Sequence, residues 1–300
     1  MTEKEFLLKK YCEMIDKHIA NHSVFFANPS SAWIEPFKIA DNLYYVGDRM
    51  VCIHLIDAGE GLILIDSGYP GATHLLIDSI WRAGFDPKNV RWIIHTHAHY
   101  DHFGASEEFR RLYGTKLAIS RVDAESIKQK PQRAHMLPEC FPYAKIPDFD
   151  YEIEDGEIFA YGNVKIRCVL TPGHTDGVLS LFFEVTDHGK TYLAGTFGGA
   201  GVGQLTIPYL CYNERPKDRA EVMLRSIEKV WDEPVAVHLG NHPGNSQTIA
   251  KRERQLAEGG NPFVAPDSWH NFLTDLRTSV NHKIRENEKT QQEINELYYE

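Results

Sequence analysis

The chain has 300 residues, of which 42% are hydrophobic and 25% are charged, a composition typical of a globular protein that buries a full core. This length fits one large α/β domain or two small ones. The net charge of −10 disfavours nucleic acid or an anionic membrane as a partner, and we expect neither.

The first part of the chain predicts a helix, a strand meander and then alternating elements. Apolar residues at helical spacing predict a helix over 3–20, and Asn28-Pro29-Ser30-Ser31 breaks it. Apolar runs separated by glycine turns predict antiparallel strands at 43–46, 51–56 and 62–65. We then expect helix 73–82, strand 90–94, helix 105–113, strand 116–120 and helix 122–129.

The second part repeats the pattern of strands followed by helices. Residues 131–150 are rich in proline and aromatic residues, which predicts a loop over a site. Strands are expected at 164–170, 179–185 and 191–194, followed by helix 216–231 and strand 234–239. This order predicts an αββα sandwich, in which two mixed sheets pack face to face with helices on the outer faces. From Trp269 the sequence again has a helical pattern, which becomes mostly polar past residue 281.

The stretch that carries the most chemistry is His95-Thr96-His97-Ala98-His99-Tyr100-Asp101-His102, which follows a buried strand pattern. Imidazole and carboxylate groups are the ligands of zinc and of neighbouring divalent metals. Residues two apart in an extended loop lie about 6–7 Å apart. A turn would therefore place His97 and His99 on one ion while Asp101 and His102 face a second. The alternative, a surface loop that is only rich in histidine, is disfavoured by this spacing.

This stretch resembles the signature of the metallo-β-lactamase-fold superfamily, and the resemblance covers most of residues 33–270. The resemblance divides the chain into a helical extension at 1–32, a metallo-β-lactamase-like domain at 33–270 and a helical tail at 271–300. Thr171-Pro172-Gly173-His174-Thr175 is similar to the Pro-Gly-His-Thr motif of the family. It implies that His174 joins His97 and His99 and leaves one coordination position open, as in catalytic zinc sites.

Residues 239–244, Leu-Gly-Asn-His-Pro-Gly, resemble the last ligand motif of the subclass B3 metallo-β-lactamases. This resemblance implies that His242 joins Asp101 and His102 on the second metal. His238 is a competing candidate, but it lies within an apolar run, which favours a buried structural role.

Two further positions are interpreted through the resemblance. Asp66 ends a buried strand, where it caps a turn or, as in the family, lies beneath the metals and orients their ligands. Thr196 stands where glyoxalase-like members carry a metal-bridging aspartate, so the pattern is closer to the B3 enzymes. We expect Thr196 to point to solvent or substrate and not to bind metal. The run 198–203, rich in glycine, lacks the lysine of a phosphate loop and predicts a flexible loop at the site.

Histidines outside these motifs have no ligand spacing and are interpreted as core or surface residues. They are His18, His22, His54, His74, His135, His188, His270 and His282.

These residues predict a dinuclear metal-dependent hydrolase that opens a cyclic amide, lactone or ester with a metal-bound hydroxide, which Asp101 orients. Two divalent metal ions are expected, with zinc favoured over iron or manganese. A small-molecule substrate is expected, and the sequence leaves open whether copies of the chain assemble. Specificity is expected in loops 131–150 and 197–215. The aromatic candidates for substrate binding are Tyr69, Phe141, Tyr143, Tyr209 and Tyr212.

Two alternatives on the same fold are a di-iron redox protein and a non-catalytic binding protein. In the family, the redox members typically carry Glu at the position of His99 and Asp at that of Thr196, and both positions differ here. Loss of a metal ligand would mark a non-catalytic protein, and all six are present.

The expected location is the cytoplasm. No apolar run approaches the roughly 18 residues of a membrane span, and Met1-Thr2-Glu3-Lys4-Glu5 does not begin a secretory signal. The five cysteines are scattered and lack Cys-x-x-Cys spacing, so we expect reduced, mostly structural thiols.

Overall fold

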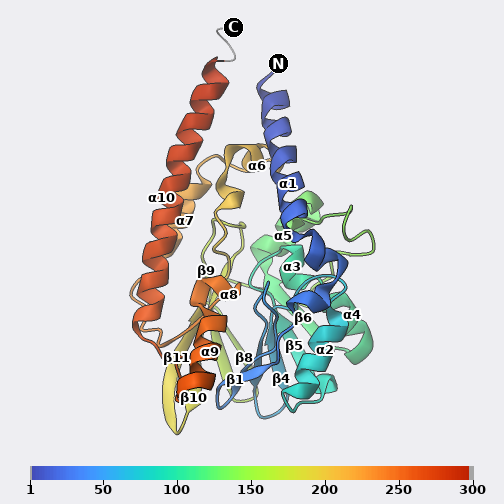
Figure 1. Ribbon diagram of the computed structural model, residues 1–300, viewed down its shortest axis with the longest axis vertical. Coiled ribbons are helices and arrows are strands. Elements are labelled where there is room, and N and C mark those ends of the chain that lie inside the picture. Colours follow the sequence, from blue (N-terminus) through green and yellow to red (C-terminus); the bar gives the residue numbers. More distant parts are fainter. Residues whose placement is uncertain (1, 297–300) are drawn as a thin grey trace.

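Two β-sheets lie face to face in the computed structural model of the chain, which describes residues 2–296 (Figure 1). The seven-stranded sheet is antiparallel from β1 to β4 and parallel from β4 to β7. Its strands, in order, are β1 (Phe37–Ala40), β2 (Leu43–Tyr45), β3 (His54–Asp57), β4 (Leu62–Ile65), β5 (Val90–Ile94), β6 (Lys116–Ser120) and β7 (Tyr151–Ile153).

The five-stranded sheet has the order β12-β11-β10-β9-β8, in which only β11 and β12 are parallel. Its strands are β8 (Ile158–Tyr161), β9 (Val164–Leu170), β10 (Leu179–Asp187), β11 (Lys190–Thr196) and β12 (Val237–Leu239). Both sheets are mixed, as the sequence predicted.

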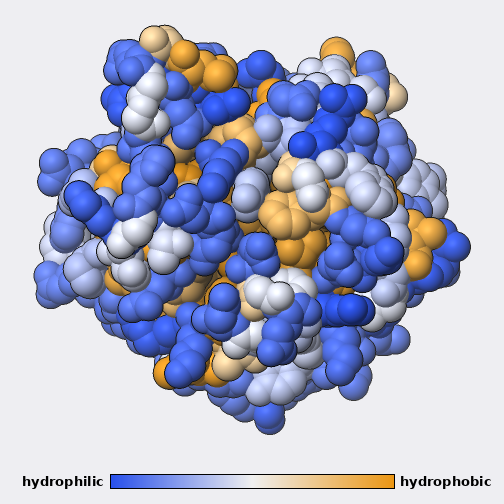
Figure 2. Space-filling model, turned by 90° about the horizontal axis from the view of Figure 1, so that it is seen from below, coloured by the Kyte–Doolittle hydropathy of each residue, from blue (hydrophilic) through white to orange (hydrophobic). Residues whose placement is uncertain are grey.

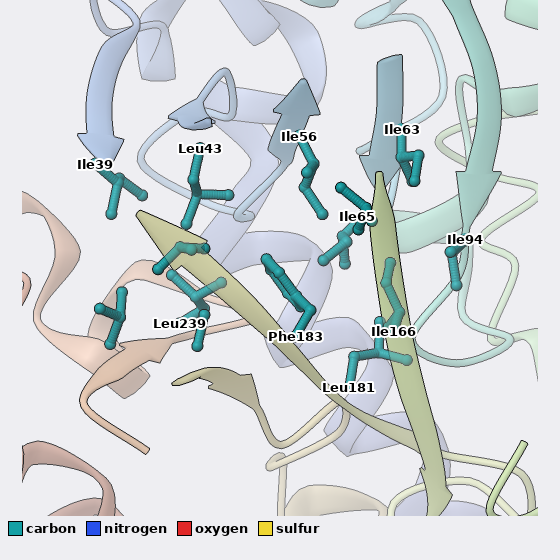
Figure 3. Packing of buried hydrophobic residues seen from close by; sticks show 14 of the residues in the cluster. Ile39, Leu43, Ile56, Ile63, Ile65, Ile94, Ile166, Leu181, Phe183 and Leu239 are labelled. Carbon is teal, nitrogen blue, oxygen red and sulfur yellow. The ribbon is translucent and has the colours of Figure 1, made fainter. Parts of the chain in front are cut away.

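The main core lies between the sheets, where side chains of the two inner faces meet (Figure 3). Ile56 and Ile65 of the first sheet face Leu181 and Phe183 of the second, and all four are buried. Side chains alternate across a strand, so Phe182, between Leu181 and Phe183, turns to the opposite face and packs among the helices. Strand β10 therefore has buried residues on both faces.

Helices cover the outer face of each sheet. Leu76 and Ile80 of α2 and Phe109 of α4 pack on the first sheet, whereas Met223 of α7 and Trp269 of α10 pack on the second. This arrangement confirms the αββα sandwich. The helices are α1 (Glu3–Ala27), α2 (Thr73–Arg82), α3 (Tyr100–Phe103), α4 (Ser106–Tyr113), α5 (Arg121–Gln129), α6 (Ile207–Tyr212), α7 (Arg219–Lys229), α8 (Pro243–Ser246), α9 (Thr248–Glu258) and α10 (Asp267–Glu296).

The two terminal helices extend from the same end of the molecule (Figure 1). Helix α1 begins with a capping box, in which Thr2 and Glu5 exchange hydrogen bonds. Leu7 of α1 and Ile294 of α10 are buried together. Helix α10 runs without a break across residue 270, so the division of the chain at that point stays a prediction.

The surface opposite these helices is mainly hydrophilic, with hydrophobic residues in separate patches (Figure 2). Among the described residues, no helix combines the length and the apolar character that crossing a bilayer requires.

Several element boundaries differ from the sequence-based expectation. Helix α1 continues to Ala27, beyond the predicted residue 20, and stops at Asn28 before Pro29. Strand β3 begins at His54 rather than 51, and residues 207–212, expected in a loop, form α6. Three strands (β1, β7 and β8) and three helices (α3, α8 and α9) are absent from the sequence-based expectation. The 131–150 segment is a loop apart from a short 3-10 helix at Pro131–Ala134.

Candidate metal centre

The predicted ligands come from strand ends that meet at one edge of the sandwich. Strands β4 and β5 are parallel neighbours, so the residues after them, Asp66 and the run from His95 to His102, emerge side by side. On the second sheet, His174 follows β9 and His242 follows β12. Chain segments far apart in sequence are therefore brought together by sheet topology.

The structure brings the six predicted ligands into two groups of three. Ligand atoms of His97, His99 and His174 lie within 4.8 Å of one another, and those of Asp101, His102 and His242 do the same. The rings of His97 and His102, one from each group, have centroids 4.1 Å apart, so the two groups adjoin. Metal binding at these groups stays a prediction.

Hydrogen bonds leave the outer ring nitrogens of these histidines available for metal. The Nδ1 atoms of His97 and His174 lie 2.7 and 2.8 Å from the carbonyl oxygens of Gly198 and Gly201. A carbonyl only accepts, so each Nδ1 carries the proton and each Nε2 keeps a lone pair. The Nε2 atoms of His97, His99 and His102 are buried without a hydrogen-bond partner. This donor set fits divalent metals, because an unpaired buried nitrogen is otherwise costly.

Glycines make the close approach of the 198–201 loop to the histidines feasible. A Cβ atom built on Gly198 would lie 2.1 Å from the carbonyl oxygen of Leu179, and one on Gly201 would lie 2.8 Å from Cε1 of His174. The predicted flexible loop is therefore a closely packed one, because its backbone supplies acceptors to two of the histidines.

Asp66 lies beneath the second group and holds it in place. Its Oδ2 accepts a hydrogen bond from Nδ1 of His102 at 2.7 Å and one from the Thr96 hydroxyl, while its Oδ1 accepts from the Thr96 amide. Asp66 has a φ of 62°, a left-handed conformation that aspartate tolerates better than most residues. These contacts match the orienting role that the resemblance implied.

Asp123 ties the two ligand loops of the first group together, a role that no sequence motif indicates. It lies on α5, is 1% exposed and accepts hydrogen bonds from the amides of Ala98 and Gly177 and from the Thr175 hydroxyl. Ala98 lies between His97 and His99, and Thr175 follows His174. One carboxylate therefore sets the spacing of all three histidines.

The charges of the two groups differ. Burial, followed by the neighbouring histidines, holds the pKa of His97 and of His99 well below its usual range, and burial lowers the pKa of His174 to about 3. Burial also opposes charge on His102, but Asp101 and Asp66 outweigh it and raise the pKa of His102 to about 10. Burial alone would raise the pKa of Asp101, whereas His102 and the nearby histidines hold it well below its ordinary value. At neutral pH the first group is thus uncharged, whereas the second pairs the ionised carboxylate of Asp101 with a protonated His102.

A cavity of about 210 Å³ opens over the two groups. Its lining includes His18 and His22 of α1 and His135 of the 131–150 loop, besides ligand residues of both groups. The absence of ligand spacing had indicated core or surface residues, and the structure adds that these three half-buried histidines line the cavity. His18 and His22 are four apart on one helix, a spacing that puts them on the same face, but nothing in the sequence places that face over the site.

The aromatic candidates are distributed unevenly. Tyr69 lines the cavity over the ligands, Tyr209 lines an adjoining cavity of about 280 Å³, and Tyr212 lines one of about 690 Å³. Phe141 is instead buried in the hydrophobic core, and Tyr143 is 59% exposed on the surface. Neither residue lines one of these three cavities, since the loop folds Phe141 inward against Phe26 of α1, and substrate contact by these two residues stays a prediction.

Two other predicted residues are buried. His238 is 1% exposed, and its Nδ1 lies 3.3 Å from the Ser268 hydroxyl, which agrees with a structural role. Thr196 is also 1% exposed, because the end of β11 is covered, so it does not point to solvent, and the alternative that it faces substrate stays a prediction. Its hydroxyl has no hydrogen-bond partner.

Comparison with known proteins gives both sequence and structural relatives. The family model of the metallo-beta-lactamase superfamily matches residues 46–245. An N-acyl homoserine lactonase of a Bacillus species is 25% identical over 169 residues, which cover 49% of this chain and 63% of the lactonase. A hydroxyacylglutathione hydrolase of Maricaulis maris is 28% identical over 153 residues, 51% of this chain and 49% of that enzyme. The chain thus spans less than two thirds of the length of these relatives.

Solved structures align over more of the chain. The FEZ-1 metallo-beta-lactamase from Legionella gormanii is 27% identical, with a TM-score of 0.76, over 85% of this chain and 97% of that one. The subclass B3 metallo-beta-lactamase BJP-1 of Bradyrhizobium japonicum is 24% identical, and at this identity its TM-score of 0.78 over 88% of this chain and 99% of that one shows the shared fold. Because the family model covers 200 of the 300 residues, from 46 to 245, the chain belongs to the metallo-beta-lactamase superfamily.

Proposed function

We propose that this protein is a dinuclear metal-dependent hydrolase that opens cyclic amides, lactones or esters. The observation that carries the proposal is the pair of adjoining donor groups with unpartnered buried nitrogens beneath a cavity. His97, His99 and His174 would hold one metal, and Asp101, His102 and His242 the other, with zinc the favoured ion. Thr196 supplies no bridging carboxylate, and His99 is an imidazole, so the donor set differs from that expected for a redox site.

Metals bound at these groups would supply an acidic water, with a pKa of about 7, and would polarise the substrate carbonyl. The chain's own residues do the rest. Asp101 is the carboxylate among the six donors, so it can both bind metal and accept a hydrogen bond from the attacking water. The side chains of Asp101 and His242 are 14% and 38% exposed, whereas His102 is fully buried. Substrate therefore approaches from the side of Asp101 and His242.

The cavities around the site support a substrate with an apolar substituent. His135 lines the cavity over the ligands and also the neighbouring cavity of about 690 Å³. This second space lies between α1 and the 131–150 loop and contains Ile15, Met136 and Leu137 among its lining residues. Its size is that of a typical small-molecule site. The lactonase and thioester hydrolase among the relatives agree with carbonyl chemistry.

A hydrolysis panel with controlled metal content tests the proposal. Metal-free protein would be titrated with zinc while hydrolysis of a lactone, an aryl ester, a β-lactam, a thioester and a phosphodiester is followed. We expect activity on at least one of the first three classes, which rises as metal approaches two ions per chain and is lost with a chelator.

The matched control separates metal loading from general damage. His174→Ala should lose metal and activity, whereas His270→Ala, at an exposed position of α10, should retain both. Protein that holds two ions per chain and hydrolyses neither the lactone, the aryl ester nor the β-lactam would contradict the proposal.

A further inference from the structure

A further cleft, of about 460 Å³, lies between α8, α9, α10 and the segment of Ala200 and Val202, and it shares no lining residue with the cavity over the metal groups. Its lining combines apolar and polar residues, and the polar ones include Lys251, Arg254, Asn245 and Ser268. From these residues we propose that the cleft is a binding site for a small oxyanion, a phosphate or a carboxylate. The proposal does not depend on the hydrolase function.

The strongest observation is the environment of Lys251. Its side chain lines the cleft, yet the residue is only 6% exposed. An ammonium has three donors, and within residues 2–296 that of Lys251 has one hydrogen-bond partner, the Ser268 hydroxyl at 3.2 Å, and no carboxylate in ion-pair contact. Buried charges are normally paired, so an anion from outside the chain would complete this site.

Neighbouring groups extend the same donor surface. Ser268 lines the cleft beside Lys251, and its hydroxyl lies 3.3 Å from Nδ1 of His238, a buried residue behind the cleft. Arg254 is exposed at the cleft and adds a second positive charge. Asp267 and Asp275 also line the cleft, but both are exposed, and neither forms an ion pair within the described residues. Because the cation of Lys251 is buried and the acidic residues lie at the surface of the cleft, the site favours a small anion over an extended one.

The rest of the chain makes this arrangement selective. At a net charge of −10 the protein repels anions in general, so anion binding requires local cations such as Lys251 and Arg254.

The cleft is also linked to the metal groups. Asn245, at its wall, donates to Asn241, whose amide in turn donates to the Gly198 carbonyl that holds His97.

Nuclear magnetic resonance of protein labelled with ¹³C at lysine Cε tests the site directly. The chemical shift of the Lys251 Cε reports on this side chain regardless of metal content or hydrolysis. The Lys251 signal is identified by its loss in Lys251→Met. Inorganic phosphate and, separately, acetate would be added at constant ionic strength, with chloride as the control anion. Burial, with Arg254 adding to it, lowers the pKa of Lys251 to about 8. A bound oxyanion should raise this pKa, and the arm that saturates at lower concentration identifies the preferred ligand.

Calorimetry with variants completes the test. Lys251→Met should weaken binding of the preferred anion about 10- to 100-fold, the loss expected for a hydrogen bond between charged groups. Lys251→Arg should weaken it less, and Lys289→Met, at an exposed position of α10, should leave it unchanged.

A stability measurement distinguishes a binding site from a structural lysine. Without anion, Lys251→Met should raise the melting temperature, because an unpaired buried charge is replaced by an apolar side chain of similar size. The proposal is overturned if neither phosphate nor acetate shifts the Lys251 signal at 10 mM (about the weakest affinity expected for such a site). It is equally overturned if Lys251→Met binds both anions as the unaltered protein does.

Discussion

Replacement of Asp123 by asparagine isolates the contribution of the carboxylate that spaces the three histidines of the first group. If the amide oxygen takes the place of Oδ2, it keeps the hydrogen bonds from Ala98 and Thr175. The amide NH₂ then faces the Gly177 amide, which now donates to Oδ1 at 2.7 Å, so a donor meets a donor. The reverse orientation loses two bonds instead of one.

The expected magnitude follows from this count. One lost hydrogen bond to a charged group costs about 1.5–3 kcal/mol. Burial raises the pKa of Asp123, so part of that cost is offset when the buried charge is removed. We therefore expect Asp123→Asn to lower the free energy of unfolding by about 1–3 kcal/mol. Zinc affinity at the first group should fall about tenfold, as for other groups that orient ligands.

Urea unfolding of the metal-free protein measures the stability term, and competition with a chromophoric chelator measures zinc affinity. Glu125→Gln is the control, because it makes the same change of charge at an exposed position of the same helix. If Asp123→Asn lost stability but bound the first zinc within threefold of the unaltered protein, histidine spacing would not depend on Asp123.

Three further outcomes are expected. Asp101→Asn should leave one metal per chain and abolish most turnover, whereas Thr196→Ala should retain both metals. Elemental analysis measures the metal content, and loss of a metal from Thr196→Ala would make Thr196 a ligand. Gly201→Ala should weaken zinc binding more than tenfold, since the added Cβ meets the ring of a ligand histidine. Gly203→Ala is the control and should leave zinc binding unchanged, because no atom lies within 4 Å of its added Cβ. Equal zinc affinities of the two variants would refute the packing argument. Because the pKa of His102 is raised to about 10, metal at the second group must displace a proton, so its apparent affinity should rise about tenfold per pH unit between pH 6 and 8. Calorimetry in buffers of different ionisation enthalpy would detect that proton, and its absence would contradict the predicted charge of His102.

The sequence predicted the elements that are long or flanked by clear signals. Helix 73–82 and strands 62–65, 90–94 and 116–120 have the predicted bounds, because continuous burial or amphipathic spacing marks them. Strands β7 and β8 escaped prediction because they lie at the edges of their sheets and are largely exposed, which removes the apolar pattern.

The two ligand groups could be predicted because their residues lie in short motifs with a recognisable spacing. The residues that position these ligands could not be predicted. The partners of Asp123 lie 25 to 54 residues away. Such a distance leaves no local pattern, and only the packing of α5 against both ligand loops reveals the connection. For the same reason the sequence does not indicate that His18 lines the cavity, because tertiary contacts set the direction of α1 over the site.

Helix α1 lies outside the segment 46–245 that matches the superfamily, yet two of its side chains line the cavity over the ligands. None of the residues packed between the two sheets comes from α1. Under the proposed function, reactivity and substrate choice are thus encoded in separable stretches of the chain. Phe25 of α1 packs with Tyr100 and Phe103 of the ligand segment, so this part of the helix is constrained by the core. Under the proposed function, the substrate range of this scaffold can therefore diverge, in evolution or by design, through the α1 positions that line the cavity, such as His18 and His22.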